Sequence, residues 1–401
     1  AWAQQRVPLT LAEAEDLALH NEPGQSGLLA RAEALEEQAV AAGQLPDPVL
    51  RVGVGNFPIE SGGFSTEAMT QGQLGIRQSF PPGKTRSLST SKFQSLSSEM
   101  ALNADARARD VLTAARNAWL ETFYWERAHE TVSDARKYFE DLVDVTRSLY
   151  GVGKKDQQDV LRAELELSRI DDRLIDIDRQ RRASRAALSQ WLGRESLRPL
   201  AQKMPDWSNV PELQALIDGV ARHPAILAAD ARVAANDASV RLAEERFKAG
   251  WAVDLSYGYR DGLLPNGSPR SDFVSLSVSV DLPFFKKNRQ DRSFAAALSE
   301  RRAAEDSREA EQRRLTSRLE AELARWQELS KRIALYQQRI LIQTDNQSNA
   351  ALAAYRSEAG DFADVMRAEI DALNARLDFE RLQIEQAQTY AVLANLGGLS
   401  P

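Results

Sequence analysis

The residues most able to act together chemically are acids that follow two glycine-bearing turns. Asp156 and Asp159 follow the first turn, and Asp361 and Asp364 follow the second at a constant offset of 205 residues. A carboxylate at such a place can accept hydrogen bonds from the free N–H groups that begin a helix, and its charge suits the helix dipole. Asp156 and Asp361 are the better placed for capping. Asp159 and Asp364 are therefore available for a second role, with local support of the helix as the alternative.

Other reactive side chains do not form a recognisable catalytic or metal-binding set. The chain has no Cys, no Gly-rich phosphate loop, no Ser nucleophile signature and no His-Glu-x-x-His pattern. His20, His129 and His223 are far apart, and His20 and His223 take equivalent places upstream of a proline, which favours a structural role. The four methionines form no cluster. We predict that the protein is not an enzyme and needs no cofactor or bound metal.

The chain is a tandem duplication of a unit of about 200 residues. Residues 150–164 and 355–369 share seven identities in fifteen positions, and Leu188–Gly193 matches Leu393–Gly398 at the same offset. We place the first structural repeat at 1–200 and the second at 201–401.

The sequence of each repeat predicts a helix of moderate length, then a β-hairpin, then a long helical hairpin. The moderate helices are expected at about 27–42 and 225–249, and the helical hairpins at 86–193 and 288–396. The stretch 86–150 contains neither Pro nor Gly, and as one helix its 65 residues would span roughly 97 Å. A helix of that length belongs in an extended coiled coil rather than in a compact core.

The two β-hairpins, 49–81 and 251–283, alternate apolar and polar residues with period two. The clearest strand sets Val274, Leu276, Val278, Val280 and Leu282 against Ser275, Ser277, Ser279 and Asp281. Each strand is predicted to have about nine to eleven residues, the length that crosses a bilayer when tilted. Aromatic residues at the strand ends resemble the girdles of a membrane interface; they are Phe57, Trp251, Tyr257, Tyr259, Phe284 and Phe285.

The composition restricts the class of protein. A net charge of −7, with 51 Lys and Arg against 58 acids, argues against nucleic acid as the main partner. No run of about 18 apolar residues offers a transmembrane helix, so a membrane protein of this composition would use strands. Four strands cannot close a barrel, but three protomers would supply twelve with no free edge. The alternative is an amphipathic sheet packed on a soluble core. Ala1-Trp2-Ala3 fits the end of a secretory signal peptide.

Two β-hairpins, each followed by a long helical hairpin and duplicated in tandem, resemble the TolC-like outer-membrane efflux family over essentially the whole chain. The Tyr-x₈-Asp-Val-[Leu/Met]-x-Ala pattern at both hairpin turns is similar to that family's periplasmic tip. The resemblance implies a mixed, mainly α fold: an α-barrel of antiparallel helical hairpins, with four strands contributed to a trimeric, 12-stranded transmembrane β-barrel. It also implies a location in the outer membrane of a Gram-negative bacterium. The partners would be outer-membrane lipid, a periplasmic adaptor and an inner-membrane pump of the RND type.

The same resemblance assigns roles to residues at the tip. Tyr355 matches the tip tyrosine, Asp159 its acidic partner, and Asp364 the first acid of the ring that narrows the tunnel mouth. Arg367 stands where a second acid is usual, and Arg162 is its equivalent in the first repeat, so the mouth would carry a mixed ring. An Asp364–Arg367 ion pair could form at i, i+3 spacing. The expected adaptor-contacting residues are Tyr150, Gly151, Gly153, Gly360 and Asp361, with the glycines also serving the tight turns.

Two Pro-rich segments resemble the heavy-metal cation branch of this family. They are Gln44–Pro48 before the first strand and Gln78–Arg86 after the second, although such residues are also ordinary breakers at helix-to-strand junctions. We therefore expect a passive exit duct for heavy-metal cations, with organic compounds as the alternative cargo. A soluble periplasmic coiled-coil adaptor or scaffold is the alternative from another class. Segments 194–215 and 394–401 are expected to form a belt around the middle of the tunnel.

Overall fold

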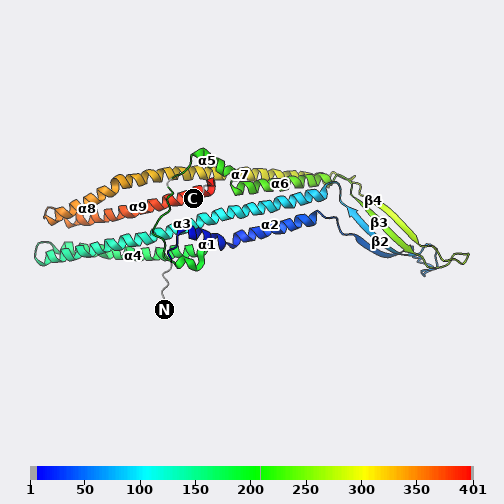
Figure 1. Cartoon of the computed structure of the whole chain (residues 1–401), viewed down its shortest axis with the longest axis horizontal. Coiled ribbons are helices and arrows are strands. Elements are labelled where there is room, and N and C mark those ends of the chain that lie inside the picture. Colours follow the sequence, from blue (N-terminus) through cyan, green and yellow to red (C-terminus); the bar gives the residue numbers. More distant parts are fainter. Residues whose placement is uncertain (1–6, 208, 399–401) are drawn as a thin grey trace. The chain divides into compact units, whose positions relative to one another are not determined.

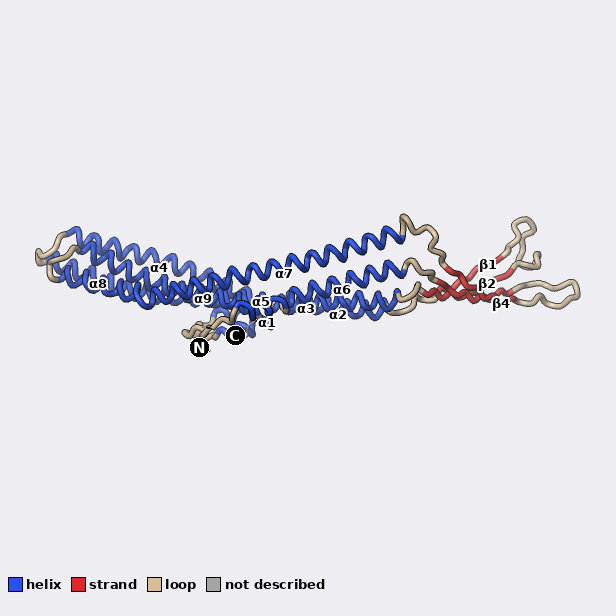
Figure 2. Tube along the Cα trace, turned by 90° about the horizontal axis from the view of Figure 1, so that it is seen from above, coloured by secondary structure: helices blue, strands red, loops and turns tan. Residues whose placement is uncertain are grey.

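The computed structural model describes residues 7–207 and 209–398, and its elements are labelled in chain order in Figure 1. The predicted signal-peptide end and residues 399–401 of the predicted belt lie outside this description. Two compact units are present, and each draws on both halves of the sequence. Unit 1 comprises residues up to 26 with 104–224 and 312 onward, and unit 2 comprises 27–103 and 225–311. Figure 2 separates the helices, in blue, from the strands, in red.

Unit 1 is helical. The hairpin of the first repeat joins α3 (Thr85–Gly151) to α4 (Gln157–Leu192), and that of the second joins α8 (Leu341–Arg356) to α9 (Phe362–Gly397). The prediction of one helix over 86–150 is confirmed. The second long helix is interrupted: α7 (Gln290–Leu335) passes through a π-helical turn, Tyr336–Ile340, before α8 begins. No Pro or Gly marks this turn, so the sequence pattern did not reveal it.

Two short helices and a 3-10 turn in unit 1 were not predicted. They are α1 (Leu11–His20), the 3-10 turn Gly193–Leu197, and α5 (Leu213–Ala221). Helix α1 begins with a capping box, in which the Thr10 hydroxyl accepts from Glu13 N–H at 3.2 Å and the Glu13 carboxylate accepts from Thr10 N–H at 3.1 Å. This Thr-x-x-Glu signal was available in the sequence.

Two apolar clusters stabilise unit 1. One lies between the helical hairpins toward their turns and includes Phe139, Ile170, Phe362 and Leu373. The other lies around Trp119, which is fully buried and stacks on Phe123 with ring centroids 5.3 Å apart. Burying one such side chain contributes about 1.5–3 kcal/mol, so these clusters stabilise the packing of the hairpins.

Unit 2 contains one sheet and four helical segments. These are α2 (Pro23–Ala42), of which the unit includes residue 27 onward, α6 (Pro224–Glu245), and the first parts of α3 and α7. The sheet has the order β1-β2-β3-β4 and is antiparallel throughout, with strands Val49–Gly55, Gln71–Phe80, Trp251–Tyr259 and Phe273–Val280. Strands β1 and β4 have seven and eight residues, so they are shorter than the predicted nine to eleven. Beyond β4 a single bond, from Asp281 N–H to Gly250 O at 2.8 Å, continues the pairing.

The apolar faces of the four strands coincide in the sheet. The register places Leu50, Ile76, Leu255 and Leu276 in one row across it. All four are exposed, Leu276 to 71%. Gln78, the polar exception in β2, donates to Pro46 O at 2.9 Å and so satisfies its amide at the end of the sheet. Apart from Gln78, one face of the sheet is therefore apolar, and the described part of the chain leaves most of it uncovered.

The Pro-Pro-Gly segment has a structural explanation at the junction between sheet and helix. Thr85 donates its hydroxyl hydrogen to Pro82 O at 2.6 Å where α3 begins. Gly83 has a φ of +53°, and a Cβ there would lie 1.7 Å from the Glu245 carboxylate, which accepts from Lys84 N–H at 2.8 Å. The glycine of the motif is required by this conformation and close approach.

Over the residues that the structure describes, no helix is both long enough and apolar enough to cross a membrane.

Candidate functional site

The two hairpin turns in unit 1 share one backbone geometry. In the first, Lys154 N–H donates to Leu149 O and Gly153 N–H to Tyr150 O, both at 2.9 Å. In the second, the N–H groups of residues 359 and 358 donate to the carbonyls of 354 and 355, at 2.9 and 3.2 Å. Each pair is a Schellman motif, whose C′ residue takes a left-handed conformation.

The left-handed residue is a glycine in only one turn. Gly153 has a φ of +73°, whereas its equivalent, Glu358, has a φ of +61° and pays the steric cost that a side chain incurs there. Gly360, which was expected to serve this turn, does not take the left-handed position, because Glu358 occupies it. Gly360 instead lies close to the preceding helix, since a Cβ on it would be 3.0 Å from Ala354.

The capping acids behave differently in the two repeats. Asp361 is the N-cap of α9, and its carboxylate accepts from Ala363 N–H at 3.1 Å. Asp156 takes the N-cap position of α4 but makes no capping hydrogen bond through its side chain. Asp159 and Asp364 lie in the first turns of their helices.

The second hairpin contacts the first through Tyr355. Its hydroxyl donates to Asp159 Oδ2 at 3.4 Å, while its ring packs on Phe362 and lies 4.2 Å from Lys155 Nζ. Burial and the neighbouring Asp159 carboxylate raise the pKa of Tyr355 to about 12, so the hydroxyl is a donor at neutral pH. Burial and the Asp361 carboxylate raise the pKa of Asp159, against the opposing effects of Lys155 and Tyr355.

The arginines at the tip divide between the two hairpins. Arg162 of α4 lies 3.8 Å from the Asp361 carboxylate, which gives a second polar contact between the hairpins. Arg367 lies 3.3 Å from the Asp364 carboxylate, but this ion pair is within α9. Both partners are well exposed, and an exposed pair of this kind contributes about 0.3–0.5 kcal/mol. Within one protomer the Asp364–Arg367 pair therefore does not join the hairpins.

A further inter-hairpin contact was missed by sequence reasoning. Glu369 of α9 accepts from Tyr138 of α3 at 2.8 Å and from the buried Ser348 hydroxyl of α8. Burial is the main cause, with the Glu369 carboxylate second, of a raised pKa at Tyr138. Glu369 is one of the seven repeat identities, so the signal was present without a partner to interpret it.

The equivalent tyrosines of the two repeats have opposite environments. Tyr355 is 3% exposed, whereas Tyr150 is 48% exposed. Val152, which follows Gly151, is also largely exposed. The first turn therefore presents an apolar surface to solvent, and the second turn supplies the contact with the neighbouring hairpin.

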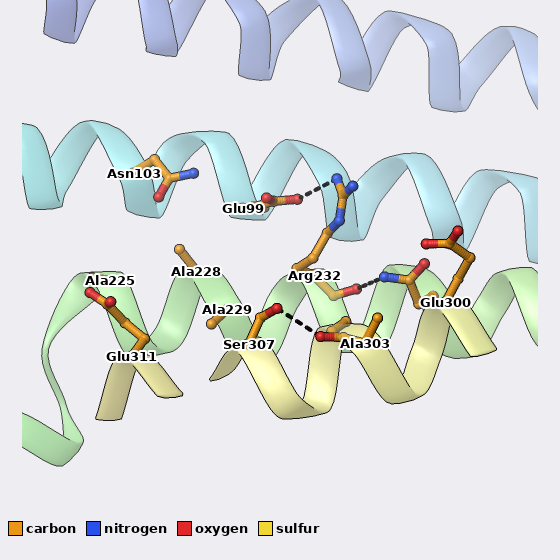
Figure 3. Close-up of a pocket in the computed structure, with 12 residues that line it drawn as sticks. Glu99, Asn103, Ala225, Ala228, Ala229, Arg232, Glu300, Ala303, Ser307 and Glu311 are labelled. Carbon is orange, nitrogen blue, oxygen red and sulfur yellow. Dashed lines mark hydrogen bonds and ion pairs between the residues drawn. The ribbon is translucent and has the colours of Figure 1, made fainter. Parts of the chain in front are cut away.

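Open grooves lie between the helices. Figure 3 shows one in unit 2, of about 420 Å³, where alanines of α6 and α7 form the floor and an ion pair of 3.4 Å joins Arg232 to Glu99. No group of three His, Cys, Asp or Glu side chains within 7–207 and 209–398 could hold a metal ion. His223 is buried and hydrogen-bonded to Asn395 at 3.1 Å, and His20 bonds to Asp16 O at 2.7 Å. Both have the predicted structural roles.

Comparisons with known proteins agree with this architecture. Residues 218–399 match the family model of the outer membrane efflux proteins. Structures of CusC are similar over 100% of this chain and 94% of that one, with a TM-score of 0.82 at 14% identity. The structure of the outer membrane protein VceC from Vibrio cholerae is similar over 97% of this chain and 96% of that one, with a TM-score of 0.79 at 18% identity. The open MtrE outer membrane channel of Neisseria gonorrhoeae is similar over 97% of this chain and 88% of that one, with a TM-score of 0.75 at 16% identity. No curated protein matches the sequence itself.

The second repeat matches the family model, and the whole chain has the fold of solved outer membrane channels. The family match of the second repeat agrees with the resemblance to the TolC-like outer-membrane efflux family, and the predicted mainly α fold class and tandem repeat are confirmed. Proteins of this family are channels rather than enzymes, in agreement with the prediction of no catalytic role.

A pH dependence is expected if the Tyr355–Asp159 contact holds the tip closed. The raised pKa of Asp159 means that the closed tip binds a proton more tightly than a tip in which this carboxyl is solvated, at its ordinary pKa of 3.8. The closed tip is favoured at low pH and is weakened as pH rises through the raised pKa. Lys155, Asp156, Asp361 and Tyr355 surround the carboxyl.

Channel conductance measured from pH 3.5 to 7 should therefore rise with pH. Asp159→Asn should abolish this rise of conductance with pH. Asp364→Asn, which changes the exposed equivalent in the second repeat, should keep it. A rise that survives in Asp159→Asn would show that another group controls the tip.

Proposed function

We propose that the protein is the outer-membrane exit duct of a tripartite efflux system. Three copies would close a twelve-stranded barrel in the outer membrane, continued by a helical tunnel into the periplasm. Substrate would pass passively from an inner-membrane pump and a periplasmic adaptor, through the tip and the tunnel, to the outside. The channel family and the fold support this proposal.

The observation that carries it is the exposed apolar face of the sheet. Val52 and Leu276 are 77% and 71% exposed, and no described element covers them. Burying one side chain of this size is worth about 1.5–3 kcal/mol, so a cover of lipid is strongly favoured over water. Strands β1 and β4 end the sheet within the described chain, and pairing β1 of one copy with β4 of the next would satisfy both edges.

We assign the tip the roles of gate and adaptor contact. Tyr355 with Asp159, and Arg162 with Asp361, hold the two hairpins together in one protomer. Asp364 and Arg367 are exposed on the same helix and are available to neighbouring copies in a trimer. The exposed Tyr150 turn, with Gly151 and Gly153, is the natural surface for an adaptor.

The direct test is reconstitution of the purified protein. A detergent-solubilised trimer that inserts into planar bilayers and gives stepwise ionic conductance supports the duct. A protein that fractionates with soluble periplasmic contents, needs no detergent and gives no conductance would instead be the coiled-coil adaptor or scaffold.

We propose heavy-metal cations as the cargo, with organic compounds as the alternative. The support is the sequence resemblance of 44–48 and 78–86, and it is weakened by the structural role of the Pro-Pro-Gly segment at Gly83. A deletion strain, with and without the cloned gene, should be grown on copper, silver, zinc, cobalt, cadmium and a drug panel. Selective metal sensitivity supports the metal branch, and drug sensitivity with unchanged metal tolerance assigns the duct to a multidrug pump.

A further inference from the structure

We propose that Arg51, Arg77 and Asp254 form a charge filter that makes the exit barrel prefer anions over cations. The inference rests on the proposed function, because it requires the polar face of the sheet to line the lumen. The filter would select the species that leave through the barrel by their charge, separately from the tip.

The three side chains meet on the polar face of the sheet. Arg77 and Asp254 are register partners on β2 and β3, with Arg77 Nη1 3.9 Å from Asp254 Oδ2. Arg77 Nη2 also donates to the Ser279 hydroxyl of β4 at 3.1 Å. Arg51 Nη1 of β1 lies 3.2 Å from Asp254 Oδ1, so one carboxylate lies between two guanidinium groups.

Gly75 provides the path for Arg51. The register sets Arg51 opposite Gly75, and Asp254 lies one strand further on. A Cβ on Gly75 would be only 3.1 Å from Ser256 and 3.2 Å from Leu255 O, so this place is kept free of a side chain. The Arg51 side chain can therefore cross β2 and reach a carboxylate on β3.

The charges within the four strands do not cancel. Arg51, Arg77 and Asp254 are the only charged residues inside the strand bounds, all of which lie within the described chain, so the strands of each protomer carry a net charge of +1; Asp281, on the same face, follows β4 and is outside this count. The side chains of Arg51 and Arg77 are 58% and 31% exposed, against 19% for Asp254. An ion passing the belt would meet guanidinium groups first.

Three copies would place six arginines and three aspartates around one lumen, a net charge of +3. Fixed charge on the wall of a water-filled pore raises the local concentration of counter-ions within about 10 Å of it at 0.1 M salt. We infer that anionic or neutral species pass most readily. A metal ion would cross this belt best as an anionic complex rather than as the free cation.

Reversal potentials in a KCl gradient across a planar bilayer test the filter. The wild type should favour chloride, and Arg51→Gln with Arg77→Gln should lower the chloride-to-potassium permeability ratio by at least about threefold. Arg51→Lys with Arg77→Lys should keep the ratio, because charge is retained, and Asp254→Asn should raise it. Ser275→Ala, on the same face, is the neutral control.

The outcomes separate the filter from the duct itself. Stable channels that favour potassium, or a ratio that is unchanged in the Gln double variant, would overturn the filter while leaving the duct intact. A ratio that follows Arg367→Gln instead would place selectivity at the tip and also overturn it. Absence of any conductance in the wild type would overturn the proposed duct, and the filter with it.

Discussion

Replacing Tyr355 with Phe together with Arg162→Gln is expected to shift the channel strongly toward its open state. These two changes remove the polar contacts at 3.4 and 3.8 Å that join the hairpins at the tip of each protomer. A net hydrogen bond is worth about 0.5–1.5 kcal/mol, so three copies of the Tyr355 bond alone hold roughly 1.5–4.5 kcal/mol against opening. The open fraction of single channels should rise by at least about tenfold if all three must break together.

The repeat supplies a matched control for this experiment. Tyr150→Phe changes the equivalent but exposed tyrosine, and it should leave conductance unchanged. Asp364→Ala alone should also have a small effect, because its ion pair with Arg367 lies within one helix. Wild-type conductance in the Tyr355/Arg162 double variant would contradict the gate and leave these residues with a role in local packing.

Much of the fold followed from pattern. Seven repeat identities, a Pro-free and Gly-free stretch at 86–150, and four alternating segments predicted the duplicated hairpins and the sheet. These features depend on residues close in sequence or on a simple period, which a single sequence can show. The contacts at the junctions are different, because Glu245 approaches Gly83 and Pro46 O accepts from Gln78 across long stretches of sequence.

The contacts between hairpins could not be predicted in the same way. The Glu369 carboxylate accepts hydrogen bonds from Tyr138, 231 residues away, and from Ser348. Nothing in the local sequence around these three residues predicts those bonds. The opposite exposures of Tyr150 and Tyr355 show the same limit, since the same residue, in turns of the same backbone geometry, is exposed in one repeat and buried against the neighbouring hairpin in the other. The Tyr355–Asp159 pairing came from family resemblance rather than from spacing. Its geometry is now observed, whereas its role as a gate stays a prediction.

The repeats also diverge where their surroundings differ. Gly153 and Glu358 hold the same left-handed position, yet only the first has the residue best suited to it. A glycine motif in one turn therefore did not predict the other. A Schellman turn is specified by its hydrogen bonds, and a side chain at C′ is tolerated when those bonds form.

The largest loss of stability is expected from Trp119→Ala in α3. Trp119 is fully buried, stacks on Phe123, and donates its indole N–H to Leu9 O at 3.3 Å. Leu9 is in turn bridged to Leu200, so this one side chain supports the N-terminal segment and the chain that follows α4. Truncating a buried tryptophan costs about 3–5 kcal/mol through lost burial and the cavity left behind.

Thermal unfolding in detergent should measure the loss of global stability in Trp119→Ala, and amide hydrogen exchange should measure the loss of local stability. Trp119→Phe keeps an aromatic ring but removes the indole donor, so it should cost about 0.5–1.5 kcal/mol for the lost hydrogen bond, plus the reduced packing; Leu9 O keeps its bond from Ala201 N–H. Trp125→Ala, six residues along the same helix and only half-buried, is the matched control and should cost less. The Leu9 and Ala201 amides, which donate to Pro199 O and Leu9 O at 2.7 and 3.0 Å, should exchange faster in Trp119→Ala. Unchanged protection of these two amides would mean that the N-terminal segment is held independently of Trp119, and that the predicted belt does not depend on this core.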